Sequence, residues 1–348
     1  MANLADLDVI RIVVLGGTGN QGLSVVKALS HNAHYRISVL TRDPTSAKAL
    51  RLQSEHDVTL IPGTYTTLPG LHAALDDQDV AYISLDSFSL TEAEEYFWTF
   101  RAYDIAVQSG LKLFIYPGTR NRFAQHGYQE ECRNSHNVVS ARITEWLTAQ
   151  PLQVGAQGMG WYVLTGGVYA EMLWSLLRPV RDREGAWTFA NPCRQVSVIP
   201  LVPLEMYGVR VRWIMENPAA SVGRFVSAAP FHASFPEIAA AFAEINGVPA
   251  RFQPVETEEW MSAAAAVVDV EGTLPRGSRS DDPFAVTFRQ SFSAWWMLWQ
   301  DSMENEKDRV EAEEWVEAYY PQRGHSIRDW MAKSGYGPKT LAKLTKLT

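Results

Sequence analysis

The stretch Val13-Val14-Leu15-Gly16-Gly17-Thr18-Gly19-Asn20-Gln21-Gly22 joins an apolar run to an amphipathic one. Gly16 allows a tight turn after a strand, Gly19 lets the backbone approach a pyrophosphate, and Gly22 lets the following helix pack against the strand. The first turn of that helix offers free amide donors and the positive end of its dipole to phosphate groups. The stretch therefore predicts a strand–turn–helix unit that binds a dinucleotide.

The same alternation continues through the first 150 residues. Short β-branched runs, which predict strands, lie at Val9–Leu15, Arg36–Leu40, Val58–Ile61, Val80–Ser84 and Leu113–Tyr116. Amphipathic stretches, which predict helices, lie at Leu23–Leu29, Ser46–Leu52, Leu68–Leu75, Glu92–Gln108 and Val138–Ala149. This order favours an α/β fold in which a parallel sheet is covered on both faces. Such sheets bind ligands beyond the carboxyl ends of their strands.

From about Pro151 the pattern changes to short apolar segments that are broken by glycine and proline. Helices are predicted over Ser234–Asn246 and Val255–Val268, and Thr287–Glu317 is also predicted to be helical. The segment Val270–Pro283 is rich in Gly, Ser, Arg and Asp, which predicts a loop. One interpretation of this loop is a mobile lid over a pocket.

The composition excludes several classes of protein. The 348 residues include 31 basic and 39 acidic side chains, a net charge of −8. Nucleic acid and anionic membranes require a basic footprint, so neither is an expected partner. Two cysteines, Cys132 and Cys193, make no metal motif or disulfide framework, and no metal site is predicted. Without a basic N-terminal cluster or a long apolar run, we expect no secretory leader, no membrane span and a cytoplasmic location.

The second predicted strand ends in Thr41-Arg42-Asp43-Pro44. A site for NAD usually places an acidic residue at this point, for the ribose hydroxyls. An arginine instead fits the 2′-phosphate of NADP, both in charge and in its fork of donors. Asp43 is adjacent, but Pro44 indicates that the chain turns away there. Arg42 therefore predicts NADP(H) as the cofactor, and the alternative interpretation is a surface arginine.

These features resemble the NmrA-like family, a branch of the short-chain dehydrogenase superfamily. Further likenesses are Gly63-Thr64-Tyr65, Phe114-Ile115-Tyr116, the helix Ser140–Leu147 and the helix that starts at Phe235-Pro236-Glu237. The resemblance implies a Rossmann-type, doubly wound parallel sheet over residues 1–155. It also implies a smaller α+β region over residues 156–348 that packs closely on the sheet and binds the substrate. Members of the family prefer NADP(H), and they are either reductases, often of secondary metabolism, or redox-sensing regulators without turnover.

The resemblance also implies the residues of the cofactor site. The pyrophosphate would contact Gly16, Thr18, Gly19, Asn20, Gln21 and Gly22, and the ribose phosphate would contact Thr41 and Arg42. The adenine would lie near Gly63 and Thr64. The nicotinamide would lie near Ser87, Tyr116, Gly118, Ser140, Gly158 and Gly160.

Ser140 stands where the working reductases of the family keep a lysine. Its hydroxyl can bond a ribose, but it carries no charge with which to lower the pKa of a proton donor. His136, one helical turn earlier, is a candidate general acid near neutral pH, unless it only orders the loop. Tyr116 is a second candidate, because it ends the fifth strand and its phenol would donate to a substrate carbonyl, unless it is simply packed.

Substrate contacts are predicted for Asp86, Arg120, Trp161 and Tyr162. For Asp86 the alternative is a helix cap, and for Arg120 it is a solvated side chain. The chain also has twelve tryptophans, most of them beyond Trp146. They predict either a large aromatic core or a pocket for a bulky, flat, apolar ligand.

Three functions fit these residues. The first is an NADP(H)-dependent oxidoreductase that acts on a bulky apolar natural-product intermediate. An iminium accepts hydride without a proton, so Ser140 suits imine or iminium reduction, or a redox-assisted cyclisation, better than ketone reduction. The second is a redox-sensing regulator, and the third is a non-redox isomerase or cyclase that retains the nucleotide. The chain is expected to be a monomer or a homodimer.

Overall fold

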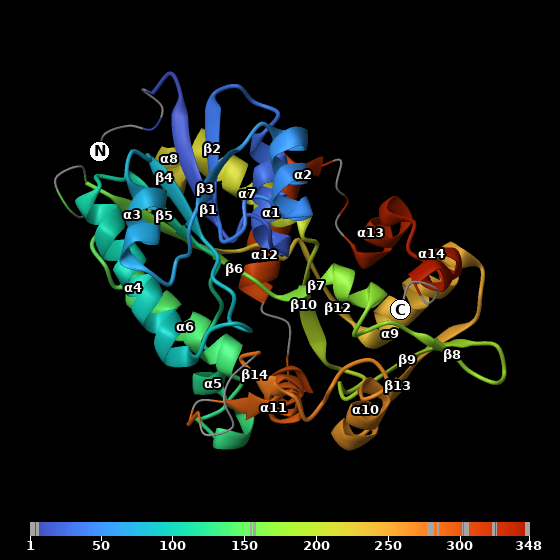
Figure 1. Ribbon diagram of the computed structural model, residues 1–348. Helices are drawn as coiled ribbons and strands as arrows, with labels where there is room; N and C mark the ends of the chain where they lie inside the picture. The colour runs from blue at the N-terminus through green and yellow to red at the C-terminus, as the bar shows by residue number, and fades with distance from the viewer. Residues whose placement is uncertain are drawn as a thin grey trace.

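The structure is a computed structural model that describes residues 4, 7–153, 155, 158–276, 282–283, 285–300, 302, 306–321, 324 and 326–344. It has a large sheet with helices on both faces and a second region of smaller sheets beside it (Figure 1). Among these residues, no helix is both long and apolar enough to cross a membrane.

The large sheet is entirely parallel, with the strand order β11-β6-β5-β4-β1-β2-β3. Its strands are β1 (Ile10–Leu15), β2 (Tyr35–Thr41), β3 (Thr59–Pro62), β4 (Val80–Ile83), β5 (Leu113–Tyr116), β6 (Gly160–Thr165) and β11 (Phe225–Ser227). The direction of winding reverses between β1 and β4, and open α/β sheets bind ligands at this switch point. The predicted doubly wound fold is confirmed, with small shifts at the strand ends.

Helices cover both faces of the large sheet. One face packs on α1 (Asn20–Leu29), α2 (Ala47–His56), α7 (Glu205–Glu216) and α12 (Glu306–Tyr319). The other face packs on α3 (Leu68–Leu75), α4 (Glu92–Gln108) and α6 (Ser135–Thr148). Side chains of β1 alternate between the two cores: Ile12 and Val14 enter the first, and Val13 and Leu15 enter the second. This explains why the strand is apolar without interruption.

The second region has a hydrophobic core of its own. Its sheets are β12-β10-β7, β13-β9-β8 and β14-β15, with β7 (Val168–Tyr169), β8 (Val180–Arg181), β9 (Trp187–Asn191), β10 (Val198–Val202), β12 (Phe231–Ser234), β13 (Ala250–Pro254), β14 (Thr273–Leu274) and β15 (Val286–Thr287). Its helices are α9 (Phe235–Asn246), α10 (Thr257–Ala264), α11 (Phe288–Gln300), α13 (Ile327–Ser334) and α14 (Pro338–Leu344), and the short helices α5 (Arg122–Gln125) and α8 (Pro218–Ser221) complete the chain. In Figure 1 the second region lies to the right of and below the large sheet.

The large sheet extends beyond residue 155, where the sequence led us to expect its end. Both β6 and β11 follow that position, and α12 returns to the same sheet from the end of the chain. The helix α7 crosses α1 closely, with the Gly208 amide donating to the Ser24 hydroxyl over 3.1 Å. A Cβ at Gly208 would lie 2.1 Å from the Ser24 carbonyl oxygen, so this crossing requires glycine. The two regions are therefore interleaved in the sequence.

Some predicted elements of the second region differ from the structure. The helix α9 agrees with the prediction, but the predicted helix Val255–Val268 is reduced to α10, and Thr287–Glu317 contains two helices, α11 and α12. Within the predicted loop Val270–Pro283, residues 273–274 form β14, and residues 277–281 lie outside the described residues. None of the twelve tryptophans is exposed, and seven are buried, which favours the aromatic-core interpretation.

Candidate functional site

The glycine loop lies at the carboxyl end of β1 and leads into α1. Gly16 has a φ of +81°, and a Cβ there would lie 2.2 Å from the Ser84 carbonyl oxygen at the end of β4. A Cβ at Gly22 would lie 2.3 Å from the Gly16 carbonyl oxygen. The turn therefore requires glycine at both positions.

The first turn of α1 is open to a ligand, because no side chain caps it. The helix starts at Gly19, whose amide bonds the Gly16 carbonyl, and the Leu23 amide donates back to the Gly19 carbonyl. The amides of residues 20–22 precede the first intrahelical donors, so they face out of the helix end together with the positive end of its dipole. This arrangement fits the pyrophosphate of a dinucleotide.

The side chain of Gln21 points into the protein. Its amide nitrogen donates to the Tyr169 hydroxyl over 2.5 Å. Its carbonyl oxygen accepts from the hydroxyls of Tyr82 (3.3 Å) and Ser84 (3.2 Å). The pyrophosphate contact expected for Gln21 is therefore left to its backbone amide, while the side chain joins α1 to β4 and β7 beneath the loop.

A pocket of about 810 Å³ lies at the carboxyl ends of β2 and β3. Its wall includes Arg42, Pro62, Gly63, Thr64, Tyr65, Gly70, Ser89, Leu90 and Glu94. The Gly63 amide donates to the Thr41 carbonyl over 3.0 Å, which brings the two strand ends together. Of the residues expected near the adenine and the ribose phosphate, Arg42, Gly63 and Thr64 line this pocket, and Thr41 does not.

Arg42 is exposed in that wall, and its guanidinium makes no hydrogen bond or ion pair within the described part of the chain. No ion pair joins it to Asp43 in the part of the chain that the structure describes, and Asp43 Oδ1 accepts from the Thr45 amide (2.8 Å) and hydroxyl (2.6 Å). These hydrogen bonds lower the pKa of Asp43. The Thr41 hydroxyl donates to the Asp43 carbonyl oxygen over 3.2 Å, so it stabilises the turn that presents Arg42.

Tyr116 and Ser140 meet at the carboxyl end of β5. Tyr116 is 3% exposed, and the Ser140 side chain, from α6, lies beside its phenol. Burial, and then the nearby charge of Glu95, raises the pKa of Tyr116 well above its usual value. The phenol is therefore a weak acid, and Ser140 adds no positive charge that would strengthen it.

His136 is held among aromatic rings and not beside a charged partner. Its ring centre lies 4.8 Å from that of Phe88 and 6.2 Å from that of Phe292. Burial lowers the pKa of His136 to about 4, so the ring is neutral at pH 7. These surroundings do not favour the expected role of His136 as a general acid near neutral pH.

Glu95, which the sequence motifs do not single out, is the buried acid at this end of the site. It is 3% exposed, its Oε1 accepts from the Ser87 hydroxyl over 3.0 Å, and its Oε2 has no partner among the described residues. Burial raises the pKa of Glu95 to about 8. One sequence signal points to it: Glu95 begins the buried stripe of α4, which continues with Thr99, Ala102, Tyr103 and Ala106.

The side chains of Asp86 and Arg120 both contact other residues of the chain. The Asp86 carboxylate accepts from the Phe88 amide over 3.0 Å and from the Ser89 hydroxyl over 2.5 Å. Asp86 thus stabilises the turn after β4, a structural role similar to the helix cap that was the alternative to a substrate contact. The Arg120 guanidinium lies 4.8 Å from the centre of the Phe225 ring, so it packs on an aromatic face and is not simply solvated.

Gly158, Gly160, Trp161 and Tyr162 lie away from the glycine loop. Gly160 pairs with Leu113 at the start of β5, which is the amino edge of the parallel sheet. The Trp161 indole donates to the Gln150 carbonyl over 3.0 Å and packs in the core under α4 and α6. Tyr162 is fully buried in the opposite core. The positions expected near the nicotinamide and substrate are therefore corrected, because β6 carries these residues at the wrong edge or inside the cores.

Glycines lie in the loops that follow the carboxyl ends of β5 and β6. The sequence motifs identify only one of them, Gly118. A Cβ at Gly118 would lie 2.1 Å from Thr144 Oγ1, and one at Gly166 would lie 2.5 Å from the Tyr207 hydroxyl. The Gly166 amide donates to the Gly118 carbonyl over 2.9 Å. Gly166 and Gly167 directly follow the apolar run of β6, and that position in the sequence is the signal that would have identified them.

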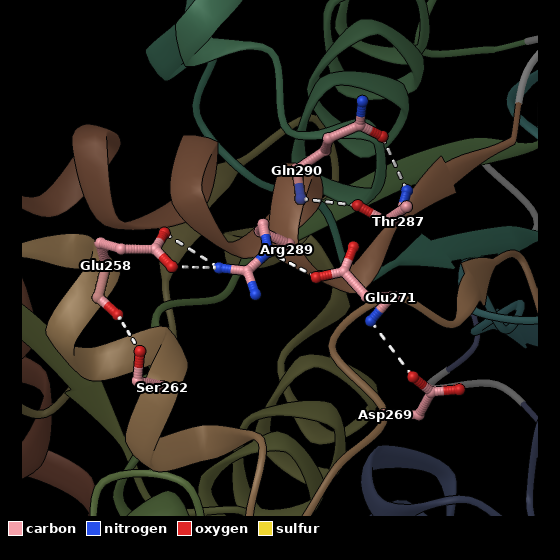
Figure 2. Close-up of polar contacts among 7 residues, drawn as sticks. All are labelled: Glu258, Ser262, Asp269, Glu271, Thr287, Arg289 and Gln290. Carbon is pink, nitrogen blue, oxygen red and sulfur yellow. Dashed lines mark hydrogen bonds and ion pairs between the residues drawn. The ribbon is translucent and has the colours of Figure 1, made fainter.

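The start of α11 is held over the loop that follows β4. Figure 2 shows Arg289 between two carboxylates: it donates to Glu258 on α10 (2.8 Å and 2.9 Å) and to Glu271 before β14 (2.6 Å). One turn later the Phe292 ring stacks with that of Phe88, at 6.5 Å between centres. The second region is thereby fastened next to the carboxyl end of β4.

Comparison with known proteins places these features in a family. The model of the NmrA-like family matches residues 9–271. The "NmrA-like family domain-containing oxidoreductase lnaB" of Aspergillus flavus is 24% identical over 265 residues, which is 70% of this chain and 75% of the relative. The similarly named hkm9 of Aspergillus hancockii is 24% identical over 262 residues, 71% of this chain and 76% of the relative.

Solved structures share the fold at low sequence identity. Nmra, described as a negative transcriptional regulator, superposes with a TM-score of 0.70 at 13% identity, over 93% of this chain and 95% of Nmra. An NADPH-dependent quinone oxidoreductase from Escherichia coli, in complex with NADPH, has a TM-score of 0.61 at 15% identity over 88% and 99%. Triphenylmethane reductase from Citrobacter sp., in complex with NADP(H), has a TM-score of 0.61 at 14% identity over 93% and 99%.

Proposed function

The chain belongs to the NmrA-like family, and we propose that it is an NADP(H)-dependent oxidoreductase. Its substrate is a bulky apolar compound, with an iminium or carbonyl group, from secondary metabolism. The names of the two fungal relatives support an oxidoreductase. The nicotinamide supplies the hydride when it is bound, and the residues of the chain bind and orient it.

The observation that carries this proposal is Arg42 in a pocket wall at the carboxyl end of β2, the strand that pairs with β1, whose loop leads into an uncapped helix. A dinucleotide with its pyrophosphate on the amides of α1 would place its adenosine half toward that pocket. A 2′-phosphate there would meet a guanidinium that has no partner among the described residues. Asp43 Oδ1 accepts from the Thr45 amide and hydroxyl, which holds this carboxylate in the turn after β2.

Calorimetric titration of the purified protein with NADPH, NADP⁺ and NADH tests the cofactor. We expect NADPH to bind at least as well as NADP⁺, and both to bind far better than NADH. A strong preference for NADP⁺ over NADPH would favour a redox sensor. If no nucleotide binds, the proposed function is wrong and the glycine loop is only structural.

Two probe substrates, chosen from the names of the structural neighbours, test the reaction. A triphenylmethane dye is a cation that becomes neutral when it accepts a hydride, so it needs no proton. A para-quinone accepts a hydride and then needs one proton. Oxidation of NADPH in the presence of either probe supports the oxidoreductase, whereas inactivity with both contradicts it.

The variant Ser140→Lys is expected to raise quinone reduction about tenfold and to leave dye reduction unchanged. An ammonium group beside the Tyr116 phenol lowers the phenol pKa, and one pKa unit corresponds to a tenfold change. Initial rates of NADPH oxidation with each probe measure the effect. The matched control is Thr148→Lys, two turns further along α6. An equal rise with both probes would show that the lysine acts on cofactor binding and not on proton supply.

The second candidate is a redox sensor that binds the nucleotide without turnover. Ser140 favours it, because the lysine that helps the working reductases of the family is replaced by an uncharged residue. Tight, selective binding of NADP⁺ combined with inactivity on both probes would support this alternative.

A further inference from the structure

Glu95 and Ser87 form a hydrogen-bonded pair at the carboxyl end of β4. Ser87 lies in the loop between β4 and α4 and is half-buried, whereas Glu95, one turn into α4, is 3% exposed. The Ser87 hydroxyl donates to Glu95 Oε1 over 3.0 Å. Within the described residues, Glu95 Oε2 has no partner. The pair therefore joins a buried carboxyl group to a half-buried serine in the loop.

The surroundings of Glu95 favour its neutral form. Burial raises the pKa of Glu95 to about 8, and the carboxylates of Asp86 and Glu92 add to this, against the hydrogen bond from Ser87. The other titratable groups that interact with it are the neutral phenols of Tyr65, Tyr96 and Tyr116. No cation is among the groups that shift its pKa. A buried carboxyl in these surroundings keeps its proton at pH 7.

The other candidates at this end of the site are unsuited to donate a proton near neutral pH. The pKa of Tyr116 is raised well above its usual value by burial, and burial lowers that of His136 to about 4. A general acid is most effective when its pKa lies near the working pH. Among these three groups, only Glu95 both holds a proton at pH 7 and releases it readily.

We propose that Glu95 is the proton reservoir of this site and that Ser87 passes the proton to the reduced substrate. The inference rests on the oxidoreductase function proposed above, and it extends the substrates from iminium compounds to carbonyl compounds and quinones. Ser87 lies in the loop that follows β4, where the nicotinamide is expected, and it is less buried than Glu95, so we place its hydroxyl between Glu95 and the substrate.

With a carbonyl substrate, one proton passes along the relay to the substrate oxygen. The carbonyl carbon accepts a hydride, the electron pair of the C=O π bond moves to oxygen, and that oxygen takes the Ser87 hydroxyl proton. Across the same 3.0 Å contact the protonated carboxyl then becomes the donor, with its proton on Oε1, and the Ser87 oxygen takes that proton in return. The net change in the protein is the loss of one proton from Glu95, which the solvent restores after product release. A dye cation needs only the hydride, so its reduction leaves Glu95 unchanged.

The first test compares Glu95→Gln with the wild type on both probes across pH. The wild-type rate with the quinone is expected to fall as the pH rises through about 8, and the rate with the dye is expected not to follow that profile. Glutamine keeps an acceptor for Ser87 but has no acidic proton, so we expect quinone reduction to fall at least tenfold and to lose the profile. Dye reduction and NADPH affinity should stay unchanged.

Two further variants separate proton supply from a structural role. Ser87→Ala should lower quinone reduction as much as Glu95→Gln, and the double variant should be no worse than either single variant. Thr99→Val is the matched control, since it removes another buried hydroxyl one turn further along the same face of α4. Quinone reduction by Glu95→Gln at the wild-type rate would overturn the proposal.

A measurement without turnover checks the acid itself. In protein labelled with ¹³C at glutamate carboxyl groups, the resonance lost in Glu95→Gln identifies Glu95, and we expect it to titrate near pH 8. Titration near pH 4 would overturn the proposal whatever the kinetics show. Wild type that is inactive on both probes would instead contradict the oxidoreductase function, and the role of Glu95 with it. Wild type active on both probes with an unaffected Glu95→Gln would contradict only the role of Glu95.

Discussion

Replacing Arg42 by alanine is expected to weaken NADPH binding roughly a hundredfold and to leave NADH binding nearly unchanged. The guanidinium is the basic group in the wall of the nucleotide pocket, and its hydrogen bonds to a phosphate would be charge-assisted. Such bonds contribute about 1.5–3 kcal/mol, and about 1.4 kcal/mol corresponds to a tenfold change in Kd. NADH has a hydroxyl in place of this phosphate, so loss of the guanidinium should change its affinity little. Titration of the variant and wild type with both nucleotides measures the difference.

The control for this variant is Arg36→Ala. Arg36 is an exposed arginine on the same strand, β2, but it lies near the amino end, across the sheet from the pocket. Its removal changes the net charge by the same amount without touching the site. If Arg42→Ala weakened NADPH and NADH equally, Arg42 would not contact the 2′-phosphate. If both variants weakened NADPH equally, the effect would be one of overall charge.

The shape of the glycine loop could be predicted from the sequence because its determinants are local. Gly16 and Gly22 are dictated by contacts within one turn and its neighbouring strand end, so the spacing of three glycines already describes the turn. Arg42 is placed by the end of the strand that precedes it.

The reacting half could not be predicted in the same way, because it depends on how helices are rotated and which edge of the sheet a strand exposes. Glu92, Glu94 and Glu95 look alike as acidic residues in the first turn of a helix. Only packing shows that Glu95 lies on the buried stripe. Likewise, Trp161 was assigned to the wrong edge of the sheet, because the sequence motifs did not show that β6 begins, and does not end, near Gly160.

Asp79→Asn is expected to lower the free energy of unfolding by about 3 kcal/mol, the lower end of the range for a broken buried ion pair. Asp79 is 2% exposed, and it accepts from Arg11 Nε (3.2 Å) and Lys112 Nζ (2.6 Å). Its carboxylate thereby joins the starts of β1 and β5 at the amino edge of the sheet. Arg11 is about half exposed and can turn to water after the change, which is why we expect the lower end. Urea denaturation at pH 7 measures the difference.

The dependence of this effect on pH identifies its electrostatic origin. Burial by itself would raise the pKa of Asp79, but the hydrogen bonds from Arg11 and Lys112 outweigh it and hold the pKa below its usual value. A carboxyl whose pKa is lower in the folded state stabilises the fold above its unfolded pKa of about 3.9. That stability is lost as the pH falls through the folded pKa. The difference in the free energy of unfolding between wild type and Asp79→Asn should therefore be largest at neutral pH and become smaller below about pH 4.

The exposed pair of Arg51 and Glu55 gives the control, because Glu55→Gln should change the free energy of unfolding little at any pH. A gap that stays constant between pH 7 and acid would mean that packing, and not charge, explains the loss.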